Sequence, residues 1–428
     1  MTSPQISASL DPRRAALRLI GQVTGEGRLL SEALGEGALA ALDGADRARA
    51  QRLATEVLRG MDRADRMLRP LLQKLPPLAV RNVLRLGVVE LAQGAAAHGV
   101  VNDMVEIVAS GKRTASFKGL VNAVLRKVAD DTPARWAGLP VPQLPGWLRA
   151  PLVAAWGRGA VVAMEAAHLA GAPLDLTAKG DPAAVAEAVG GEVLPTGSVR
   201  VTGAGQVSQL PGYAEGHWWV QDAAAAIPVR VLAPQPGERV IDLCAAPGGK
   251  TMQLAAAGAD VTALDLSGAR IGRIAENLAR TGLAARVLEG DALSFAEGGF
   301  DAVLLDAPCS ATGTIRRHPD LPHAKDGAEF AALIDQQGAM IDHALTLLRP
   351  GGRLVYCTCS LLPDEGEVQA EAALARHPGL RADRAALARP GIDPAWITPE
   401  GGLRLRPDYW AGHGGMDGFY IIALQKPA

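Results

Sequence analysis

Cysteine and long apolar runs are both scarce in this chain, and each scarcity excludes a class of protein. Only four cysteines occur in 428 residues, all within the C-terminal half, whereas a secreted protein held by disulfides is usually much smaller. No run of 18 uncharged apolar residues occurs, and the N-terminus has no apolar core of signal-peptide length before its first charges. We therefore expect a reducing, cytoplasmic location, no membrane segment, and cores large enough to fold without disulfides.

Net charge is also small, at −2, but it is unevenly distributed. Residues 1–130 contain 19 Lys and Arg against 13 Asp and Glu, a net charge of +6, which leaves −8 for the other 298 residues. A basic N-terminal part favours an anionic partner, with nucleic acid first among the candidates. On charge alone, an ordinary solvated helix surface remains an equal alternative.

The apolar periodicity and the proline content of the sequence change twice along the chain, which predicts three parts. Residues 1–130 repeat apolar positions at spacings of three and four, as in RAQRLATEVLRGMDRADRML, and predict an all-α helix bundle. Residues 131–216 begin with DTPARWAGLPVPQLPGWLRAP, whose five prolines should not continue a helix, and go on to a helix from about Pro151, a strand-like PLDLT and a helical DPAAVAEAVG. We expect a linker and small α/β subdomain here, followed by a catalytic domain over residues 217–428.

Strand-like and helical segments alternate through residues 217–428. The expected strands are RVIDLC, DVTALDLS, ARVLEGDA, FDAVLLDAP and GRLVYCTC. Such alternation predicts a parallel, doubly wound α/β sheet of Rossmann-like type, in which ligands bind at the carboxyl ends of the strands.

The first of these strands ends in the small-residue loop DLCAAPGGKT, which allows close approach of backbone N–H groups to a ligand. A P-loop is excluded because its first small residue would fall on Cys244, and adjacent glycines match a G-x-G-x-x-G dinucleotide fingerprint poorly. Binding of S-adenosyl-L-methionine is the remaining functional interpretation. The alternative is a glycine-rich turn with a purely structural role. The candidate cofactor residues in this loop are Cys244, Ala245, Ala246, Pro247, Gly248, Gly249 and Lys250.

Two acidic residues strengthen the cofactor interpretation. Asp265 ends the second strand, where a carboxylate can accept hydrogen bonds from ribose hydroxyls, and Asp291 ends the third, where it can receive an adenine amino group. A single aspartate in such a place is more often a helix cap or a turn former. Two of them behind a glycine-rich loop favour a nucleoside site.

Thiols end the fourth and fifth strands, at Cys309 in DAPCS and at Cys357 and Cys359 in YCTCS. Carbon 5 of cytosine is a poor nucleophile, and a thiolate that adds at carbon 6 converts it into an enamine that can accept a methyl group. Asp306 can bind the amidine-like edge of the base during this addition. Buried cysteines usually only pack, and we keep that interpretation for Cys244 and Cys357.

Metal and redox roles for these thiols are disfavoured. The C-T-C sequence lacks C-x-x-C spacing, and neither His318 nor His323 lies at a zinc-like interval from it. A disulfide between Cys357 and Cys359 would be strained, because the two residues are neighbours on one strand face.

Several motifs taken together resemble a known family. QDAAAAIPVRVL, DLCAAPGGKT, LLDAPCSATGTIRRHPD, LVYCTCSLLPDEGE and GMDGFYIIALQK resemble the RNA cytosine-5 methyltransferases, most closely the RsmB (Fmu, Sun) family. NDMVEIVAS and FKGLVNAVLRKV resemble the RNA-binding fold of the antitermination factor NusB. The resemblance covers nearly the whole chain, loosely over residues 135–215.

This resemblance implies roles for individual residues. Cys359 would be the nucleophile and Cys309 the thiol that assists product release, while Asp265, Asp291 and Asp306 would surround S-adenosyl-L-methionine with the glycine-rich loop. The implied substrate is one cytosine of small-subunit (16S) ribosomal RNA, methylated before the subunit is complete. We expect a monomer that uses no metal and no membrane.

One departure and two alternatives remain. After RRHPD the family tends to continue with Trp and basic residues, whereas this chain has LPHAKDGAEF, so RNA contacts of the loop after Asp320 are in doubt. An inactive RNA-binding protein would have lost residues of the strand-end site, and all of them are present. The same chemistry on transfer RNA stays open, because substrate choice depends on distributed surfaces.

Overall fold

The computed structural model describes residues 12–130 and 132–428, which form two compact units. The described part of the first unit comprises residues up to Ala150 together with Val161–Leu169 and Arg317–Asp326. The second comprises Pro151–Ala160, Ala170–Arg316 and Gly327–Ala428.

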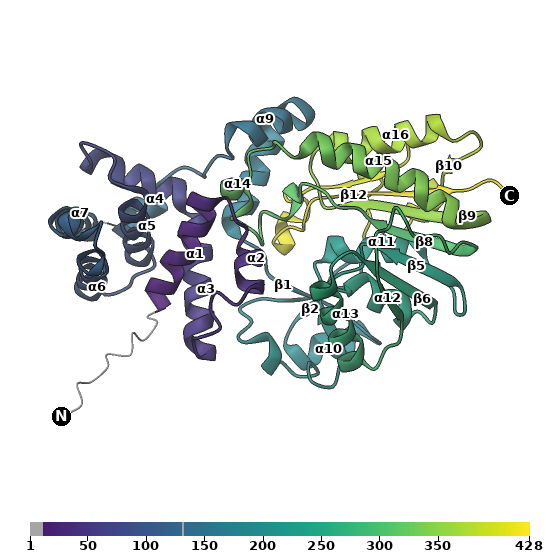
Figure 1. The fold of residues 1–428 in the computed structure, drawn as a ribbon, viewed down its shortest axis with the longest axis horizontal. Helices are drawn as coiled ribbons and strands as arrows, with labels where there is room; N and C mark the ends of the chain where they lie inside the picture. Colours follow the sequence, from purple (N-terminus) through teal and green to yellow (C-terminus); the bar gives the residue numbers. More distant parts are fainter. Residues whose placement is uncertain (1–11, 131) are drawn as a thin grey trace. The chain divides into compact units, whose positions relative to one another are not determined.

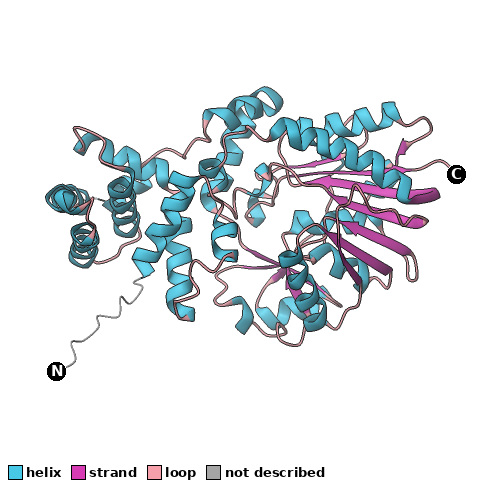
Figure 2. Cartoon of the chain, viewed as in Figure 1, coloured by secondary structure: helices cyan, strands magenta, loops and turns pink. Residues whose placement is uncertain are grey.

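The first unit is helical, as Figures 1 and 2 show. Its α-helices up to Ala137 are α1 (Pro12–Glu26), α2 (Leu30–Gly35), α3 (Gly44–Arg59), α4 (Met61–Leu68), α5 (Leu78–Ala92), α6 (Ala97–Ser110), α7 (Lys118–Ala129) and α8 (Thr132–Ala137). Helix α5 is buried on nearly all sides and packs against α1, α3, α4, α6, α7 and α8. Gly87 on α5 allows this packing, because a Cβ there would lie 2.8 Å from Cδ1 of Leu125 on α7. The all-α N-terminal bundle expected from the 3.6-residue periodicity is confirmed.

A segment from much later in the chain belongs to the same helical unit. It contains α14 (Leu321–Ala324), and the Asp320 carboxylate before it accepts a hydrogen bond from the backbone N–H of Leu30, the first residue of α2, at 2.8 Å. His323 Nε2 lies 3.0 Å from the carbonyl oxygen of Leu58. The loop whose expected basic residues are missing therefore has a packing role in this unit.

The proline-rich segment was predicted wrongly in one respect. It contributes α8 and the start of α9 (Gly146–Ala170), a helix that includes Pro151 and is interrupted at Gly157, where φ is 79° and ψ is 156°. Pro133 lies in the first turn of α8, where the missing N–H has no partner to lose. The segment therefore contains more helix than its prolines suggested, with Pro133 in the first turn of α8 and Pro151 inside α9.

The second unit contains a small antiparallel sheet with strand order β2-β3-β1-β4. The strands are β1 (Leu174–Ala178), β2 (Glu192–Val193), β3 (Val199–Val201) and β4 (Trp218–Val220), with α10 (Pro182–Val189) between the first two. Asp181 caps α10 by accepting a hydrogen bond from Ala183 N. Leu176, Val199 and Trp218 form the buried core of the small sheet. This is the small α/β subdomain that PLDLT and DPAAVAEAVG predicted.

The main sheet has the order β10-β12-β9-β8-β5-β6-β7, with β11 paired to β12. Its strands are β5 (Arg239–Leu243), β6 (Asp260–Asp265), β7 (Arg286–Glu289), β8 (Phe300–Asp306), β9 (Leu348–Thr358), β10 (Arg381–Ala382), β11 (Leu403–Leu405) and β12 (Phe419–Gln425). The five predicted strands pair in parallel, whereas β10, β11 and β12 pair antiparallel at one side. The sheet is thus mixed and not wholly parallel as predicted. The prediction missed the antiparallel strands because an apolar run such as FYIIALQ does not reveal strand direction.

Helices cover both faces of this sheet (Figure 1). Val303 and Leu305 of β8 pack with α15 (Phe330–Leu347) and α16 (Glu367–Arg376), whereas Ala302 and Leu304 pack with α11 (Ala223–Leu232) and α12 (Gly249–Ala256). Helix α13 (Gly268–Thr281) adds Ile274 to a neighbouring core cluster. Side chains that alternate between two apolar layers explain the uninterrupted apolar runs of the strands. The doubly wound, Rossmann-like architecture is confirmed.

Candidate active site

The loop between β5 and α12 carries the predicted cofactor residues at the carboxyl end of the central strand. Its Gly248 has φ at 98°, a conformation that favours glycine. Asp265, at the end of β6, is 2% exposed, and its carboxylate accepts hydrogen bonds from Ala246 N at 2.9 Å and Ser267 N at 3.1 Å. The structure therefore brings Asp265 against the glycine-rich loop.

Asp291 has a different environment. It follows β7, is exposed, and accepts a hydrogen bond from Leu293 N at 3.0 Å, which is a turn-forming contact. The side chain lies near the strand end as predicted, but in the described structure no hydrogen bond or ion pair joins it to the loop or to Asp265. Its geometry fits the turn-former alternative as well as a cofactor role.

Asp306, at the end of β8, is joined to the same loop through Lys250. The Lys250 ammonium lies 2.6 Å from Asp306 Oδ2, and the Cys357 thiol lies 3.4 Å from Oδ1. Burial disfavours the charged form of Lys250, but the neighbouring acidic groups, Asp306 first among them, together outweigh burial and raise the pKa of the ammonium. Lys250 is therefore a fixed positive charge beside Asp306 at neutral pH.

The thiols of Cys309 and Cys359 meet although 50 positions separate them in the sequence. Their sulfur atoms are 3.4 Å apart, and both side chains are partly buried. Backbone hydrogen bonds hold the two segments together, from Ala307 N to Cys357 O at 3.0 Å and from Gly313 N to Cys359 O at 2.9 Å. The hydrogen bond to Cys359, together with burial, raises the pKa of Cys309 well above its usual range. Cys309 is thus a neutral thiol that can donate to the sulfur of Cys359.

The other two cysteines are less suited to act as nucleophiles. Burial raises the pKa of Cys244 to about 12, and it raises the pKa of the fully buried Cys357 well above its usual range. A nucleophile needs a thiolate, so both thiols are inert at neutral pH. This agrees with the packing role expected for them.

Sequence reasoning did not single out two buried carboxylates of this region. Asp242 on β5 is fully buried, and burial raises its pKa to about 7, although its Oδ2 accepts a hydrogen bond from Thr251 Oγ1 at 2.6 Å. Glu365, also fully buried, accepts hydrogen bonds from Ser310, the residue after Cys309. The only sequence signal for Asp242 is that an acidic residue interrupts an apolar strand. Glu365 lies in PDEGE, which looks like a solvated turn.

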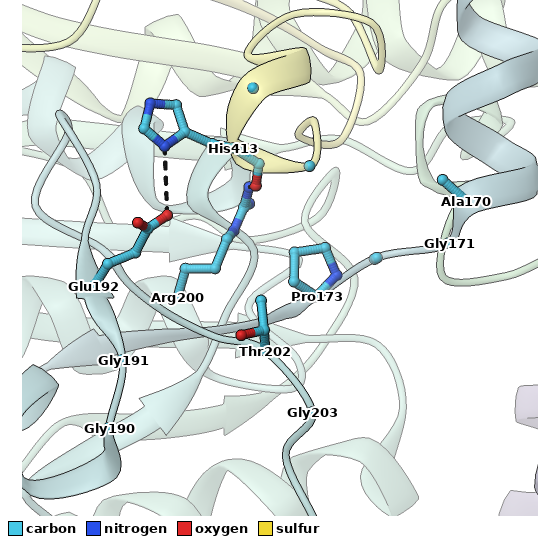
Figure 3. Close-up of a pocket in the computed structure, with 13 residues that line it drawn as sticks. Ala170, Gly171, Pro173, Gly190, Gly191, Glu192, Arg200, Thr202, Gly203 and His413 are labelled. Carbon is cyan, nitrogen blue, oxygen red and sulfur yellow. Dashed lines mark hydrogen bonds and ion pairs between the residues drawn. The ribbon is translucent and has the colours of Figure 1, made fainter.

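A separate polar cavity of about 710 Å³ opens beside the small sheet (Figure 3). Glycine-containing segments line it together with Arg200, Glu192 and His413, and the Nδ1 atom of His413 lies 3.4 Å from Glu192 Oε1. The Arg200 guanidinium is held by both carboxylate oxygens of Asp175 at 2.6 Å. None of the predicted site residues lines this cavity.

Metal-binding clusters and membrane-spanning helices are both absent from the described residues. They contain no group of three or more His, Cys, Asp or Glu side chains arranged to hold a metal ion. Across residues 12–130 and 132–428, no helix is both long and apolar enough to cross a membrane.

The site residues fit S-adenosyl-L-methionine, which carries positive charge on its sulfonium and ammonium groups. The carboxylates of Asp242 and Asp265 lie at the ends of adjacent strands beside the glycine-rich loop. Asp242 Oδ1 is buried and has no hydrogen-bond partner among the described residues. A buried acceptor without a partner is costly, and a cationic ligand nearby would offset that cost.

Known proteins resemble both units. The family described as 16S rRNA methyltransferase RsmB/F matches residues 229–425, and the NusB family matches residues 10–130. Ribosomal RNA small subunit methyltransferase B of Cronobacter sakazakii is 36% identical over 442 residues, with 98% of this chain and 99% of the relative covered. The Sodalis glossinidius protein of the same name is also 36% identical, over 89% of this chain and 93% of its own length.

A solved structure supports the fold along nearly the full length. The crystal structure of PH0851 matches with a TM-score of 0.75 at 23% identity and covers 98% of this chain and 100% of its own. Together with the two family matches, the near full-length relatives decide the assignment. The chain belongs to the ribosomal RNA small subunit methyltransferase B family and is an S-adenosyl-L-methionine-dependent RNA methyltransferase.

Proposed function

We propose that this enzyme methylates carbon 5 of one cytosine in 16S ribosomal RNA through a covalent adduct between Cys359 and carbon 6. The observation that carries the proposal is the 3.4 Å separation of the Cys309 and Cys359 sulfur atoms, beside Asp306 and the cofactor loop. Two thiols held together at adjacent strand ends suit a reaction in which one adds to the base and the other assists its release.

The chemistry divides among three side chains. The Cys359 thiolate forms a bond to carbon 6, and the electrons of the carbon 5–carbon 6 double bond move to carbon 5. Asp306 binds the N3 and N4 edge of the cytosine and so stabilises the enamine that results. Bound S-adenosyl-L-methionine supplies the methyl group that carbon 5 accepts.

Release requires transfer of the carbon 5 proton to a water molecule of the solvent. The electron pair of the broken carbon–hydrogen bond then restores the double bond while the bond between Cys359 and carbon 6 breaks. We assign assistance in this step to Cys309, whose thiol lies against the leaving sulfur. Cys244 and the other loop residues through Lys250 surround the cofactor. Cys357 lies beside Asp306.

The division of labour along the chain is part of the proposal. Residues 1–130 bind RNA, residues 131–216 form a linker and small subdomain, and residues 217–428 carry the catalysis. We also propose that the enzyme works as a monomer in the cytoplasm, without a metal, on RNA that is not yet part of a complete subunit. A specific activity on transfer RNA is the alternative substrate assignment.

Cysteine substitutions test the covalent chemistry. Cys359→Ala should give neither product nor a covalent complex, because it cannot form the enamine. Cys309→Ala should still attack and methylate, and then accumulate a protein–RNA band on a denaturing gel that resists reducing agents and requires both RNA and cofactor. Cys357→Ala, at a cysteine that neither adds to the base nor assists release, is the control and should not accumulate the band.

Other results would contradict the proposal. A band with Cys359→Ala alone would exchange the two roles, and wild-type turnover without any band in both variants would remove the cysteines from the mechanism. Bisulfite sequencing of ribosomal and transfer RNA from a deletion strain identifies the substrate, since the lost 5-methylcytosine marks it.

A further inference from the structure

The residues that follow the two thiols form one buried hydroxyl cluster. Ser310 follows Cys309 and Ser360 follows Cys359, and their hydroxyl oxygens are 3.2 Å apart. Thr312 Oγ1 lies 3.2 Å from Ser310 Oγ and 3.3 Å from Ser360 Oγ. All three side chains are at most 2% exposed. The cluster therefore links the segments that carry the thiols without contact with solvent.

One carboxylate anchors this cluster. Glu365 is fully buried, and its Oε1 accepts hydrogen bonds from Ser310 N at 2.9 Å and from Gln337 Nε2 at 3.0 Å. Its Oε2 accepts a hydrogen bond from the Ser310 hydroxyl at 2.5 Å. A carboxylate that accepts three hydrogen bonds fixes the backbone and the side chain of Ser310 together.

Glu365 also holds the other thiol segment, through its main chain. Its carbonyl oxygen accepts hydrogen bonds from Thr358 Oγ1 at 3.0 Å and from the Tyr356 hydroxyl at 2.8 Å. Thr358 is the residue before Cys359. Glu365 is thus bonded to the neighbours of both thiols, one through its carboxylate and one through its carbonyl.

Burial of this side chain is costly, because its polar head group loses its hydration and an apolar residue at the same place would fill the space without that penalty. The bonds to Ser310 define a geometry that apolar packing alone does not define. We propose that Glu365 is a positioning residue that holds the Cys309 thiol against the Cys359 thiol. Its catalytic consequence rests on the function proposed above.

The separation of the thiols can be measured without catalysis. Phenylarsine oxide condenses with two neighbouring thiols to form two As–S bonds, and the oxide oxygen leaves as water with the two thiol protons. In the full-length protein we expect tight binding that Cys309→Ala abolishes. Glu365→Ala should weaken this binding at least tenfold, and Glu365→Gln should weaken it less, because the amide can still accept from Ser310 N.

The same variants should change the fate of the RNA adduct. Misalignment of about 1 Å costs on the order of a hundredfold in rate, so Glu365→Ala should turn over about a hundredfold more slowly and accumulate the covalent band. Cofactor affinity should stay within twofold of wild type. Asp364→Asn, an exposed neighbour in the same turn, is the matched control and should change neither measurement.

The outcomes separate this inference from the proposed function. Folded Glu365 variants with wild-type arsenical affinity and adduct lifetime would overturn the positioning role. Weakened arsenical binding combined with no adduct in any variant, Cys309→Ala included, would retain the positioning role and reject the covalent mechanism. If Glu365→Ala does not fold, Glu365→Gln and Ser310→Ala decide by the same two measurements.

Discussion

Lys250 and Asp306 form an ion pair with 2.6 Å between Nζ and Oδ2, which ties the first turn of α12 to the end of β8. The Lys250 side chain is 10% exposed and the Asp306 side chain is 29% exposed. This pair connects the proposed cofactor loop to the proposed base-binding carboxylate. Its loss should therefore affect both stability and activity.

Lys250→Met should lower the free energy of unfolding by about 3 kcal/mol, because it leaves a largely buried carboxylate without its partner. A double-mutant cycle with Asp306→Asn measures the coupling by urea denaturation. The folded pKa of Lys250 is raised above 10.5, so its contribution is complete below that pH and is lost only as pH rises through the folded value. The coupling should be equal at pH 7 and pH 9, and a coupling that disappears by pH 9 would contradict this.

Asp265 and Asp291 can be distinguished by cofactor affinity. Asp265→Asn should weaken S-adenosyl-L-methionine binding by about 1.5–3 kcal/mol, the order expected for loss of hydrogen bonds to a charged acceptor. Asp265 lies against Ala246, whereas Asp291 is exposed in its own turn. Asp291→Asn should therefore have the smaller effect. Calorimetry that finds the reverse order would reassign the main acidic contact to Asp291.

Sequence patterns predicted the parts of this site that are local. Apolar runs revealed the strands, and a strand end reveals where a ligand-facing side chain such as Asp306 will lie. Glu365 could not be found in this way, because its burial depends on Ser310, 55 positions earlier. An acidic turn and a buried anchor have the same local sequence.

The same limit explains the misjudged parts of the fold. Strand β12 has the composition of its parallel neighbours, and only its pairing with β9 makes it antiparallel. The local sequence predicts a helix that starts at about Pro151, yet α9 already begins at Gly146 and is interrupted at Gly157. Long-range pairing and packing decide these features, and a single sequence does not show them.

Exposed basic residues near the start of α7 should contribute to RNA binding. Lys112, Arg113 and Lys118 are all exposed, and their combined replacement by Gln should weaken RNA binding. The slope of log affinity against log salt should fall by about 2, since each phosphate contact to single-stranded RNA contributes roughly 0.7. Arg66→Gln is the control, because Arg66 is paired with Asp62 at 2.8 Å. An unchanged slope in filter-binding titrations would assign this surface a role other than RNA binding.

Asp242 should give the free energy of unfolding a measurable pH dependence. Burial raises its pKa to about 7 in the folded protein, whereas an unfolded aspartate titrates near 3.9. The unfolded chain therefore ionises first, so stability present below about pH 4 is lost as pH rises toward 7, and little changes above that.

Asp242→Asn removes this term and can keep an acceptor for the Thr251 hydroxyl, which now bonds Asp242 at 2.6 Å. Between pH 5 and pH 8, wild-type stability should fall relative to the variant by about 2.5 kcal/mol, the part of the linkage for a shift of about three pKa units that falls in this pH range. Asp260→Asn, at the exposed start of β6, should keep the wild-type profile. Urea denaturation at each pH measures the difference. Parallel profiles for wild type and Asp242→Asn would mean that Asp242 is ionised in the folded protein, and its unpaired Oδ1 would then need a cation even without the cofactor.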